Sequence, residues 1–248
     1  MSDLRSLLYT GAAIVNAVQL QEIMIANTTE SPGNGGACCC WEIPAGTSYI
    51  NIEMWGGGGG GNGGCCCMQG RPGGSGSYLQ KSITGDQVIP GTYICICAGG
   101  STSASPTDGC AGCHSRAIGC NITTCARGGM RGYGCCNYYV NCYNCQLMCY
   151  GECCSNGGDV NIHSTTGDAI SSQYCFNIGH QYAPVAPGTV SGPLVGPGGC
   201  TCTGYGAGAN TQADPVFPGG AGFTAQHYSG GCFCGVYGAA GAVLIKFG

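Results

Sequence analysis

Four closely spaced cysteines are candidate metal ligands in this chain: Cys142, Cys145, Cys149 and Cys153. Thiolates at such short spacings can converge on zinc or on an iron–sulfur cluster. The same side chains can form disulfides or remain buried thiols, and no distant Cys-x-x-Cys or Cys-His pair stands in clean register with them. We therefore favour disulfides, keep metal as the alternative and expect no cofactor.

Cysteine is abundant throughout the chain, with 24 among 248 residues, a level typical of disulfide scaffolds. Adjacent cysteines on an extended chain point to opposite faces, so the triplets 38–40 and 65–67 should each reach several partners. Cys-x-Cys pairs place both thiols on one strand face, where they can join neighbouring strands. The candidate disulfide cysteines are Cys95, Cys97, Cys135, Cys136, Cys142, Cys145, Cys149, Cys153, Cys154, Cys200, Cys202, Cys232 and Cys234.

The run Cys110-Ala-Gly-Cys113-His114 has the spacing used for covalent haem attachment, in which two thioethers and an axial ligand meet on one ring. A chain this rich in cysteine should contain about two Cys-x-x-Cys pairs by chance, so the spacing does not predict haem. No cysteine is singled out by a His and an Asn or Asp for nucleophilic catalysis, and the glycine runs lack the Lys-Ser/Thr of a phosphate-binding loop. We assign no catalytic residue and predict a non-enzymatic protein.

Alternating side chains identify the strands that must position these groups. From residue 49 to 55, Ile50, Ile52 and Met54 share one face, and Asn51, Glu53 and Trp55 share the other. Residues 77–83 supply a second extended segment. After a Pro-Gly turn, residues 92–97 alternate, with Ile94 and Ile96 on one face. Over residues 243–247, Val243, Ile245 and Phe247 share one face opposite Leu244 and Lys246, and apolar residues on both faces predict a central or covered strand.

Six consecutive glycines, residues 56–61, follow the first of these strands. Such a run has no side chain to bury and a high entropy cost of ordering. It can be ordered only where backbone packs closely against backbone.

The order of these motifs resembles the glycine-rich domain of bacteriophage tail-fibre and other virion surface proteins. The shared features are Ile-Pro-Ala-Gly, a strand ending Met-Trp before the glycines, Gly-Gly-Ser-Gly-Ser-Tyr, Pro-Gly-Thr-Tyr and a final glycine loop with an apolar strand. The resemblance covers the first and last thirds of the domain. It implies a virion protein that forms a homotrimer and contacts other virion proteins, made in the host cytoplasm and exposed after release.

Tyrosines gather in the cysteine-rich middle, at Tyr133, Tyr138, Tyr139 and Tyr143. Tyrosine offers stiff, amphipathic contact area at low entropic cost. These side chains either cover disulfides or form a contact patch for a host cell-surface receptor.

Charge is scarce: 7% of residues are charged, against about 25% in ordinary soluble domains, and the net charge is −4. The few basic residues form no patch that could neutralise phosphates, so nucleic-acid binding is not expected. Glycine is plentiful, but 44% of residues are hydrophobic and patterned into strands, which favours an ordered protein. No convincing signal peptide is recognised; late oxidation on a released particle would reconcile this start with many disulfides.

Residues 2–26 have apolar positions at helical spacing, and we expect a helix there, with an anchoring helix or an extended arm as alternatives. Polar residues within this stretch argue against membrane insertion. We divide the chain into an N-terminal anchoring arm and linker, 1–37, and a glycine- and cysteine-rich β domain, 38–248, with a Cys/Tyr-rich insertion at about 101–199.

The predicted fold class is mainly β, a short-stranded, glycine-rich β-sandwich-like body. The expected function is that of a virion structural protein, a tail-fibre or capsid-fibre component. Two alternatives remain: a cysteine-rich metal-binding or electron-transfer protein, and a secreted, disulfide-cross-linked coat or matrix protein.

Overall fold

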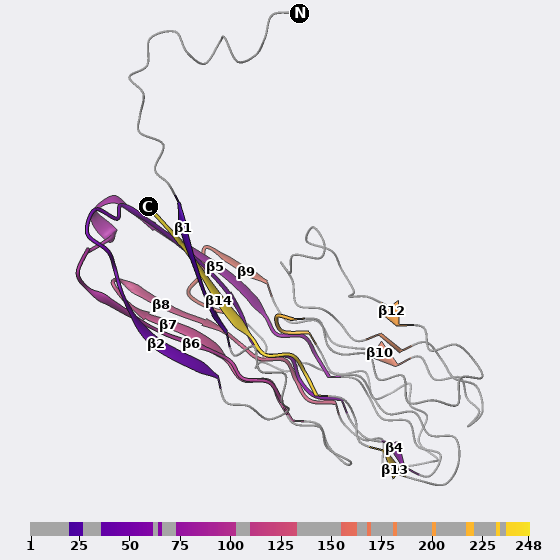
Figure 1. Ribbon diagram of the computed structural model, residues 1–248. Helices are drawn as coiled ribbons and strands as arrows, with labels where there is room; N and C mark the ends of the chain where they lie inside the picture. The colour runs from indigo at the N-terminus through magenta and orange to yellow at the C-terminus, as the bar shows by residue number, and fades with distance from the viewer. Residues whose placement is uncertain are drawn as a thin grey trace, which may run out of the picture.

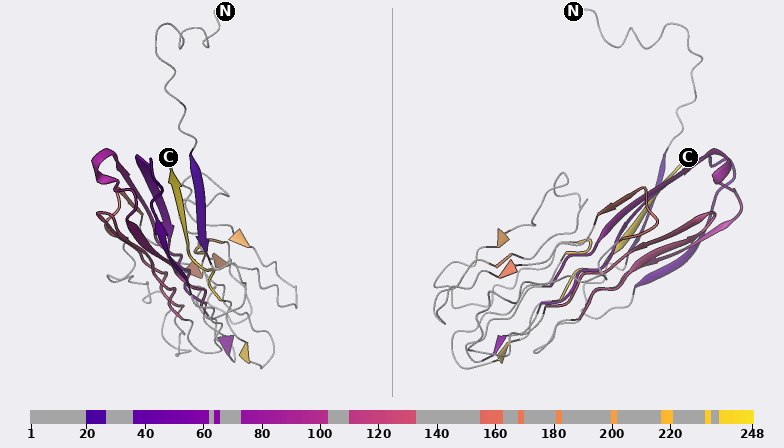
Figure 2. Two further views of the ribbon diagram at one scale, coloured as in Figure 1. Left: turned by 60° about the vertical axis from the view of Figure 1, so that its left-hand side comes forward. Right: turned by 180° about the vertical axis from the view of Figure 1, so that it is seen from behind.

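A computed structural model of the chain describes residues 20–26, 36–61, 64–65, 73–102, 110–132, 155–162, 168–169, 181–182, 200–201, 217–220, 232–233 and 237–248. The long strands gather at one end of the molecule, beside the C terminus, and extended segments run on from them toward the other end (Figures 1 and 2). Every strand pairing among the described residues is antiparallel. The protein is mainly β, as its alternating patterns predicted.

The first sheet contains five strands in the order β1-β14-β3-β5-β9. Their bounds are Gln21–Ala26 (β1), Ala242–Phe247 (β14), Tyr49–Trp55 (β3), Tyr78–Thr84 (β5) and Val160–Ile162 (β9). The last strand of the chain therefore lies between β1 and β3. This confirms the prediction of a central C-terminal strand, made from the apolar residues on both of its faces.

The second sheet contains four strands in the order β2-β6-β7-β8. Their bounds are Ala37–Glu42 (β2), Tyr93–Ala98 (β6), Ser115–Gly119 (β7) and Ile122–Ala126 (β8). A 3₁₀ turn at Gly85–Gln87 (η2) and the Pro90-Gly91 turn lie between β5 and β6. Two smaller sheets consist of two-residue strands. In one, β4 (Gly64–Cys65) pairs with β13 (Cys232–Phe233); in the other, β11 (Gln181–Tyr182) lies between β10 (Asp168–Ala169) and β12 (Cys200–Thr201).

The core lies between the two sheets. Ile50, Ile52 and Met54 of β3 are fully buried there, together with Ile94 and Ile96 of β6. The two sheets pack face to face because β14 contacts β6 and β3 contacts β7 and β8. The face assignments predicted for β3, β6 and β14 are all confirmed by this burial pattern.

The N-terminal prediction was wrong over residues 21–26, which form strand β1 rather than a helix. Ile23 and Ile25 pack against the core, and β1 pairs with β14 along its whole length. Apolar Met24 between the two isoleucines makes the run continuous, and a short continuous run does not distinguish helix from strand. Its partner strand lies more than two hundred residues away, and this long-range pairing decides the conformation.

The segment expected as an insertion, 101–199, also needs a correction. Its residues 115–126 form the β7–β8 hairpin of the second sheet. Cys120 and Asn121 make the turn with φ of 47° and 62°, the pair of positive values that a two-residue hairpin turn needs. This part of the segment therefore belongs to the β body.

Among the residues that the structure describes, no helix is long and apolar enough to cross a membrane.

Candidate functional site: the cysteine face and the glycine bundle

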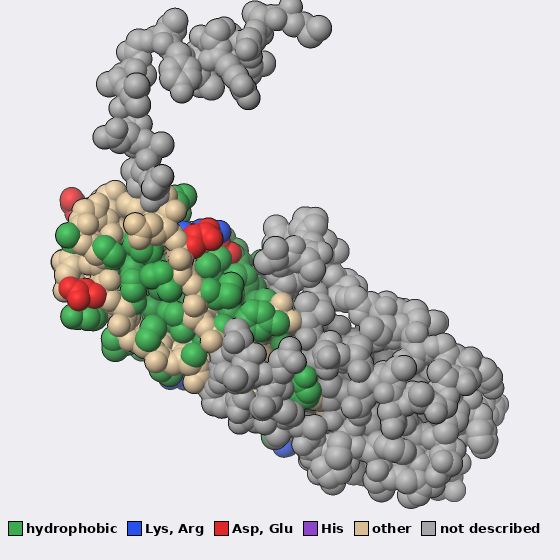
Figure 3. Space-filling view, viewed as in Figure 1, with side chains coloured by type: hydrophobic (Ala, Val, Ile, Leu, Met, Phe, Trp, Pro, Cys, Tyr) green, Lys and Arg blue, Asp and Glu red, His purple; other side chains and the backbone are tan. Residues whose placement is uncertain are grey.

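Cysteines line the exposed side of strands β2 and β6. We call this surface the cysteine face, and it consists of Cys38 and Cys40 on β2 with Cys95 and Cys97 on β6. Alternation in both strands puts these four side chains on the side away from the core, because Ile94 and Ile96 occupy the inner side of β6. The space-filling view in Figure 3 shows many hydrophobic side chains, a class that there includes cysteine, and few charged groups on the described surface that faces the viewer.

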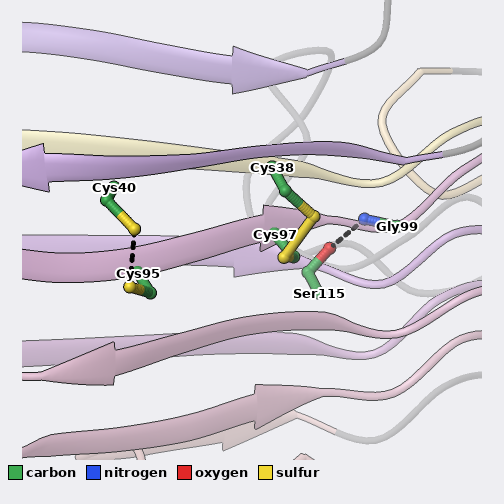
Figure 4. Close-up of a disulfide and its surroundings, with 6 residues drawn as sticks. All are labelled: Cys38, Cys40, Cys95, Cys97, Gly99 and Ser115. Atoms are coloured by element: carbon green, nitrogen blue, oxygen red, sulfur yellow. Dashed lines mark hydrogen bonds between the residues drawn. A yellow bond between two sulfur atoms is a disulfide. The ribbon is translucent and has the colours of Figure 1, made fainter.

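Cys38 and Cys97 are directly opposite each other and form a disulfide. The pairing confirms that a Cys-x-Cys side chain joins neighbouring strands, and that a triplet cysteine bonds outside its own triplet. Cys40 and Cys95 form the next pair on the same side, with Sγ atoms 2.7 Å apart (Figure 4). The contact with Cys95 raises the pKa of the Cys40 thiol above its ordinary value.

A third cross-strand pair continues the cysteine face. The Tyr93 hydroxyl donates a hydrogen bond of 3.0 Å to Glu42 Oε2, and these residues are again directly opposite. This hydrogen bond, and then the carboxylate charge, raise the pKa of Tyr93. Strands β2 and β6 are therefore linked along one side by a disulfide, a thiol pair and a hydrogen bond.

Glycine-rich segments continue the strands of both sheets at the end away from the C terminus (Figure 1). We call them together the glycine bundle. It consists of residues 56–61 after β3, 73–77 before β5, 99–102 after β6, 110–114 before β7, 127–132 after β8, 237–241 before β14, and 217–220.

The central segment of the glycine bundle is 56–61, and its amides donate to three different neighbours in turn. Amides three residues apart donate to the same neighbour. The backbone hydrogen bonds, 2.8–3.0 Å long, run from Gly56 to Ser77, Gly57 to Cys113, Gly58 to Ala239, Gly59 to Gly74 and Gly60 to Cys110. A three-residue period without bonds inside the segment is the geometry of a polyproline II-type helix.

Close packing explains why residues 56–59 are all glycine. A Cβ on any of them would collide with a backbone carbonyl oxygen of another segment, namely that of Arg127, Gly100, Gly220 or Met130. These contacts place 127–132, 99–102 and 217–220 around the central segment, in addition to the three segments that accept its hydrogen bonds. Six segments of the chain therefore surround the central one, and the prediction of backbone packed on backbone is confirmed.

The Cys-x-x-Cys-His run lies in this glycine bundle, with Cys110 and Cys113 exposed. Their carbonyls accept from amides three residues apart, so the two thiols start from equivalent positions one helical turn apart, about 9 Å along the axis. Disulfide formation needs Cα atoms within about 7 Å. His114 Nδ1 accepts a hydrogen bond of 2.9 Å from the Gly128 amide, which in the neutral ring puts the proton on Nε2. The wide separation of the two cysteines and the hydrogen bond that His114 Nδ1 accepts do not suit haem attachment.

One buried hydroxyl joins the two sheets where the glycine bundle begins. Ser115 is fully buried. Its Oγ accepts a hydrogen bond of 2.9 Å from the Gly99 amide (Figure 4) and donates one of 2.6 Å to the Trp55 carbonyl. It therefore connects β7 to the ends of β3 and β6. Sequence reasoning missed this residue, because a single serine at a strand start carries no pattern.

A polar group of three lies on the outer side of the first sheet. Glu53 Oε1 is 2.9 Å from Lys246 Nζ, and Glu53 Oε2 accepts a hydrogen bond of 3.2 Å from the Tyr78 hydroxyl. Burial and then the Glu53 charge raise the pKa of Tyr78 far above its ordinary value. The hydrogen bond with Glu53 also raises the pKa of Lys246. The Glu53 carboxylate thus stabilises the uncharged form of Tyr78 and the charged form of Lys246.

Most predicted site residues lie outside the described part of the chain. These are the alternative metal ligands Cys142, Cys145, Cys149 and Cys153, the tyrosines Tyr133, Tyr138, Tyr139 and Tyr143, and the disulfide candidates Cys135, Cys136, Cys154, Cys202 and Cys234. Cys232 is opposite Cys65 in the β13–β4 pair, and Cys200 lies in β12. Among the residues that are described, no three His, Cys, Asp or Glu side chains are grouped so that they could hold a metal ion.

A family model described as "Glycine-rich domain" matches residues 29–244, which include both the cysteine face and the glycine bundle. No curated protein matches the chain. A match over most of the chain assigns the family, and the protein therefore belongs to the glycine-rich domain family.

Proposed function

We propose that this chain is a non-enzymatic structural component of a virus particle, exposed as part of a tail fibre or capsid fibre. The observation that carries this is the glycine bundle. Its central segment is held by backbone hydrogen bonds to chains on several sides and has no side chain to rearrange. Such an element transmits force and holds a fixed distance, but it presents no reactive group at its centre.

The two packed sheets, which lie at the other end from the glycine bundle, support the same structural role (Figure 1). Each strand that enters the glycine bundle is anchored in a sheet that buries a continuous apolar core. A disulfide on the exposed cysteine face holds the edge strand β2. These are the properties of a rigid part that works outside a cell, where charge pairs are screened and disulfides persist.

The resemblance of the glycine motifs to virion surface proteins supplies the location and the partners of this proposal. The N-terminal segment anchors the chain to other virion proteins, the assembly is a homotrimer, and the tyrosines of residues 133–143 contact a host receptor. Mass spectrometry of purified particles and antibody labelling by electron microscopy test the location. If the chain is absent from particles that adsorb normally, the virion role is wrong.

A second candidate is a secreted coat or matrix protein cross-linked by disulfides. It is favoured by the exposed thiols of Cys39 and Cys113, which lie where another molecule could reach them. Electrophoresis without reductant distinguishes the two: a coat protein gives a ladder of covalent multimers, whereas a fibre component gives a single covalent size. Metal analysis of the purified chain tests the electron-transfer alternative.

A further inference from the structure

Cys40 and Cys95 are two thiols in close contact on the cysteine face. They come from strands whose register places them directly opposite each other, and their Sγ atoms lie 2.7 Å apart. Both side chains are exposed. A contact this close between two thiols places the sulfurs within reach of a covalent bond (Figure 4).

We propose that Cys40 and Cys95 form a second disulfide, so that β2 and β6 are joined by two adjacent covalent rungs. The backbone needs no rearrangement, because the neighbouring pair Cys38 and Cys97 already forms a disulfide in the same register on the same side. Directly opposite cysteines on paired strands lie within the Cα separation that a disulfide requires.

Thiol–disulfide exchange with a low-molecular-weight disulfide supplies the oxidation. The thiolate of one cysteine attacks a sulfur of the small disulfide, forms a mixed disulfide and releases one small thiolate. The second cysteine then loses its proton, attacks the protein-bound sulfur and expels the other small thiolate. Cys40 and Cys95 together lose two protons and two electrons, and the small disulfide becomes two small thiols.

Exposure makes this second rung accessible to the reagent from the solvent side. Among the described residues, strand β2 is the edge strand of its sheet and pairs with β6 alone. An exposed edge can accept a strand from another molecule. With a second disulfide, β2 is bonded to β6 at both cysteine pairs. Strand β2 then cannot separate from β6 at the Cys40 end and expose the edge of β6.

Peptide mapping of the wild-type protein tests the second rung directly. The protein is treated with oxidised glutathione, its free thiols are blocked with N-ethylmaleimide in denaturant, and it is digested without reductant. Cleavage after Trp41 and Tyr93 releases one peptide with residues 38–40 and another that begins at residue 94. We expect the two peptides to remain linked, to lack four hydrogen atoms relative to the free thiols, and to carry N-ethylmaleimide on Cys39 but not on Cys40 or Cys95.

Variants separate the two rungs. In Cys38→Ser/Cys97→Ser protein the two peptides should still be linked after oxidation, whereas adding Cys40→Ser should release them. Cys39→Ser in the wild-type background is the matched control: it removes the N-ethylmaleimide label at residue 39 and should leave both links between the peptides unchanged. Quantitative N-ethylmaleimide labelling of Cys40 and Cys95 in oxidised wild-type protein would overturn the assignment. Protection that disappears with a metal chelator, without any linked peptide, would also overturn it.

Discussion

Replacing Gly58 with alanine tests the close packing of the glycine bundle in its central segment. A Cβ on Gly58 would overlap the carbonyl of Gly220 and would approach the Gly219 oxygen to 3.0 Å. Every atom in the way belongs to a backbone, so no side chain can rotate aside. The segment must shift, and the hydrogen bond of 2.8 Å from the Gly58 amide to Ala239 is then strained or lost.

The magnitude follows from two opposing effects. Alanine restricts the unfolded chain more than glycine does, which stabilises a fold by about 0.4–1 kcal/mol where the new side chain fits. Overpacking of a close-packed interior costs about 1–3 kcal/mol, and each disturbed backbone hydrogen bond costs about 1 kcal/mol more. Such bonds join the affected segments from Gly58 to Ala239, from Ala239 to Gly220 and from Gly219 to Ala240, and the shift disturbs at least the first of them. We expect a net loss of about 2–4 kcal/mol, since the steric cost is larger.

Thermal unfolding followed by near-ultraviolet circular dichroism measures this loss under oxidising conditions. For a chain of this size, the expected loss lowers Tm by roughly 4–16 °C. The matched control is Gly85→Asn, because Gly85 has open space around its Cβ position and a φ of +57° that asparagine tolerates. The control should change the free energy of unfolding by no more than about 0.5 kcal/mol.

A Gly58→Ala protein as stable as the control would refute the close packing of six chains around residues 56–61. A loss confined to Gly58 would also contradict it, because Gly59→Ala should behave alike: its Cβ would collide with the Met130 carbonyl.

Three further predictions concern polar groups of the sandwich. Ser115→Ala removes both of its buried hydrogen bonds and should lower the free energy of unfolding by about 1–3 kcal/mol in urea titrations, whereas the exposed Ser48→Ala, with one weak contact of 3.4 Å, should change little. The pKa of Tyr78 is raised in the fold, so the stability that it contributes is complete below its ordinary pKa of 10.0 and falls as pH rises above it. The free energy of unfolding of Tyr78→Phe should therefore fall less steeply between pH 9 and 11 than that of the wild type. Equal slopes for the two proteins would contradict the burial of the Tyr78 hydroxyl. The pKa of Asp159 is lowered by hydrogen bonds from Lys81 and from the Ser82 amide, so its contribution is complete above the ordinary pKa of 3.8 and is lost as pH falls through the lowered value; Asp159→Asn should show a flatter acid limb, an effect that added salt reduces because this carboxylate is half-exposed.

Patterns within a few residues were the reliable part of the sequence reading. The alternation of Ile50, Ile52 and Met54 predicted both the strand and its buried face. Val243 and Ile245 did the same for β14. A period of two is a local property, and burial of one face enforces it.

Long-range pairing accounts for the errors. The N-terminal run around Met24 became strand β1 because β14 offers it a partner, and no local signal announces that partner. The β7–β8 hairpin was missed because Cys120 and Asn121 do not form one of the common glycine-containing turn pairs, although asparagine tolerates positive φ. The disulfide candidate Cys97 was correct, but only the register of β2 against β6 identifies Cys38 as its partner.

The sequence by itself determined that residues 56–61 must pack backbone against backbone, because a chain without side chains has no other way to gain contacts on ordering. Only the tertiary structure decided which chains surround it, with a three-residue period of hydrogen bonds, since glycine carries no side-chain pattern that encodes its neighbours. The same division holds for sulfur: composition predicts many cross-links, but the Cys38–Cys97 disulfide depends on two strands brought together across a sequence separation of 59 residues.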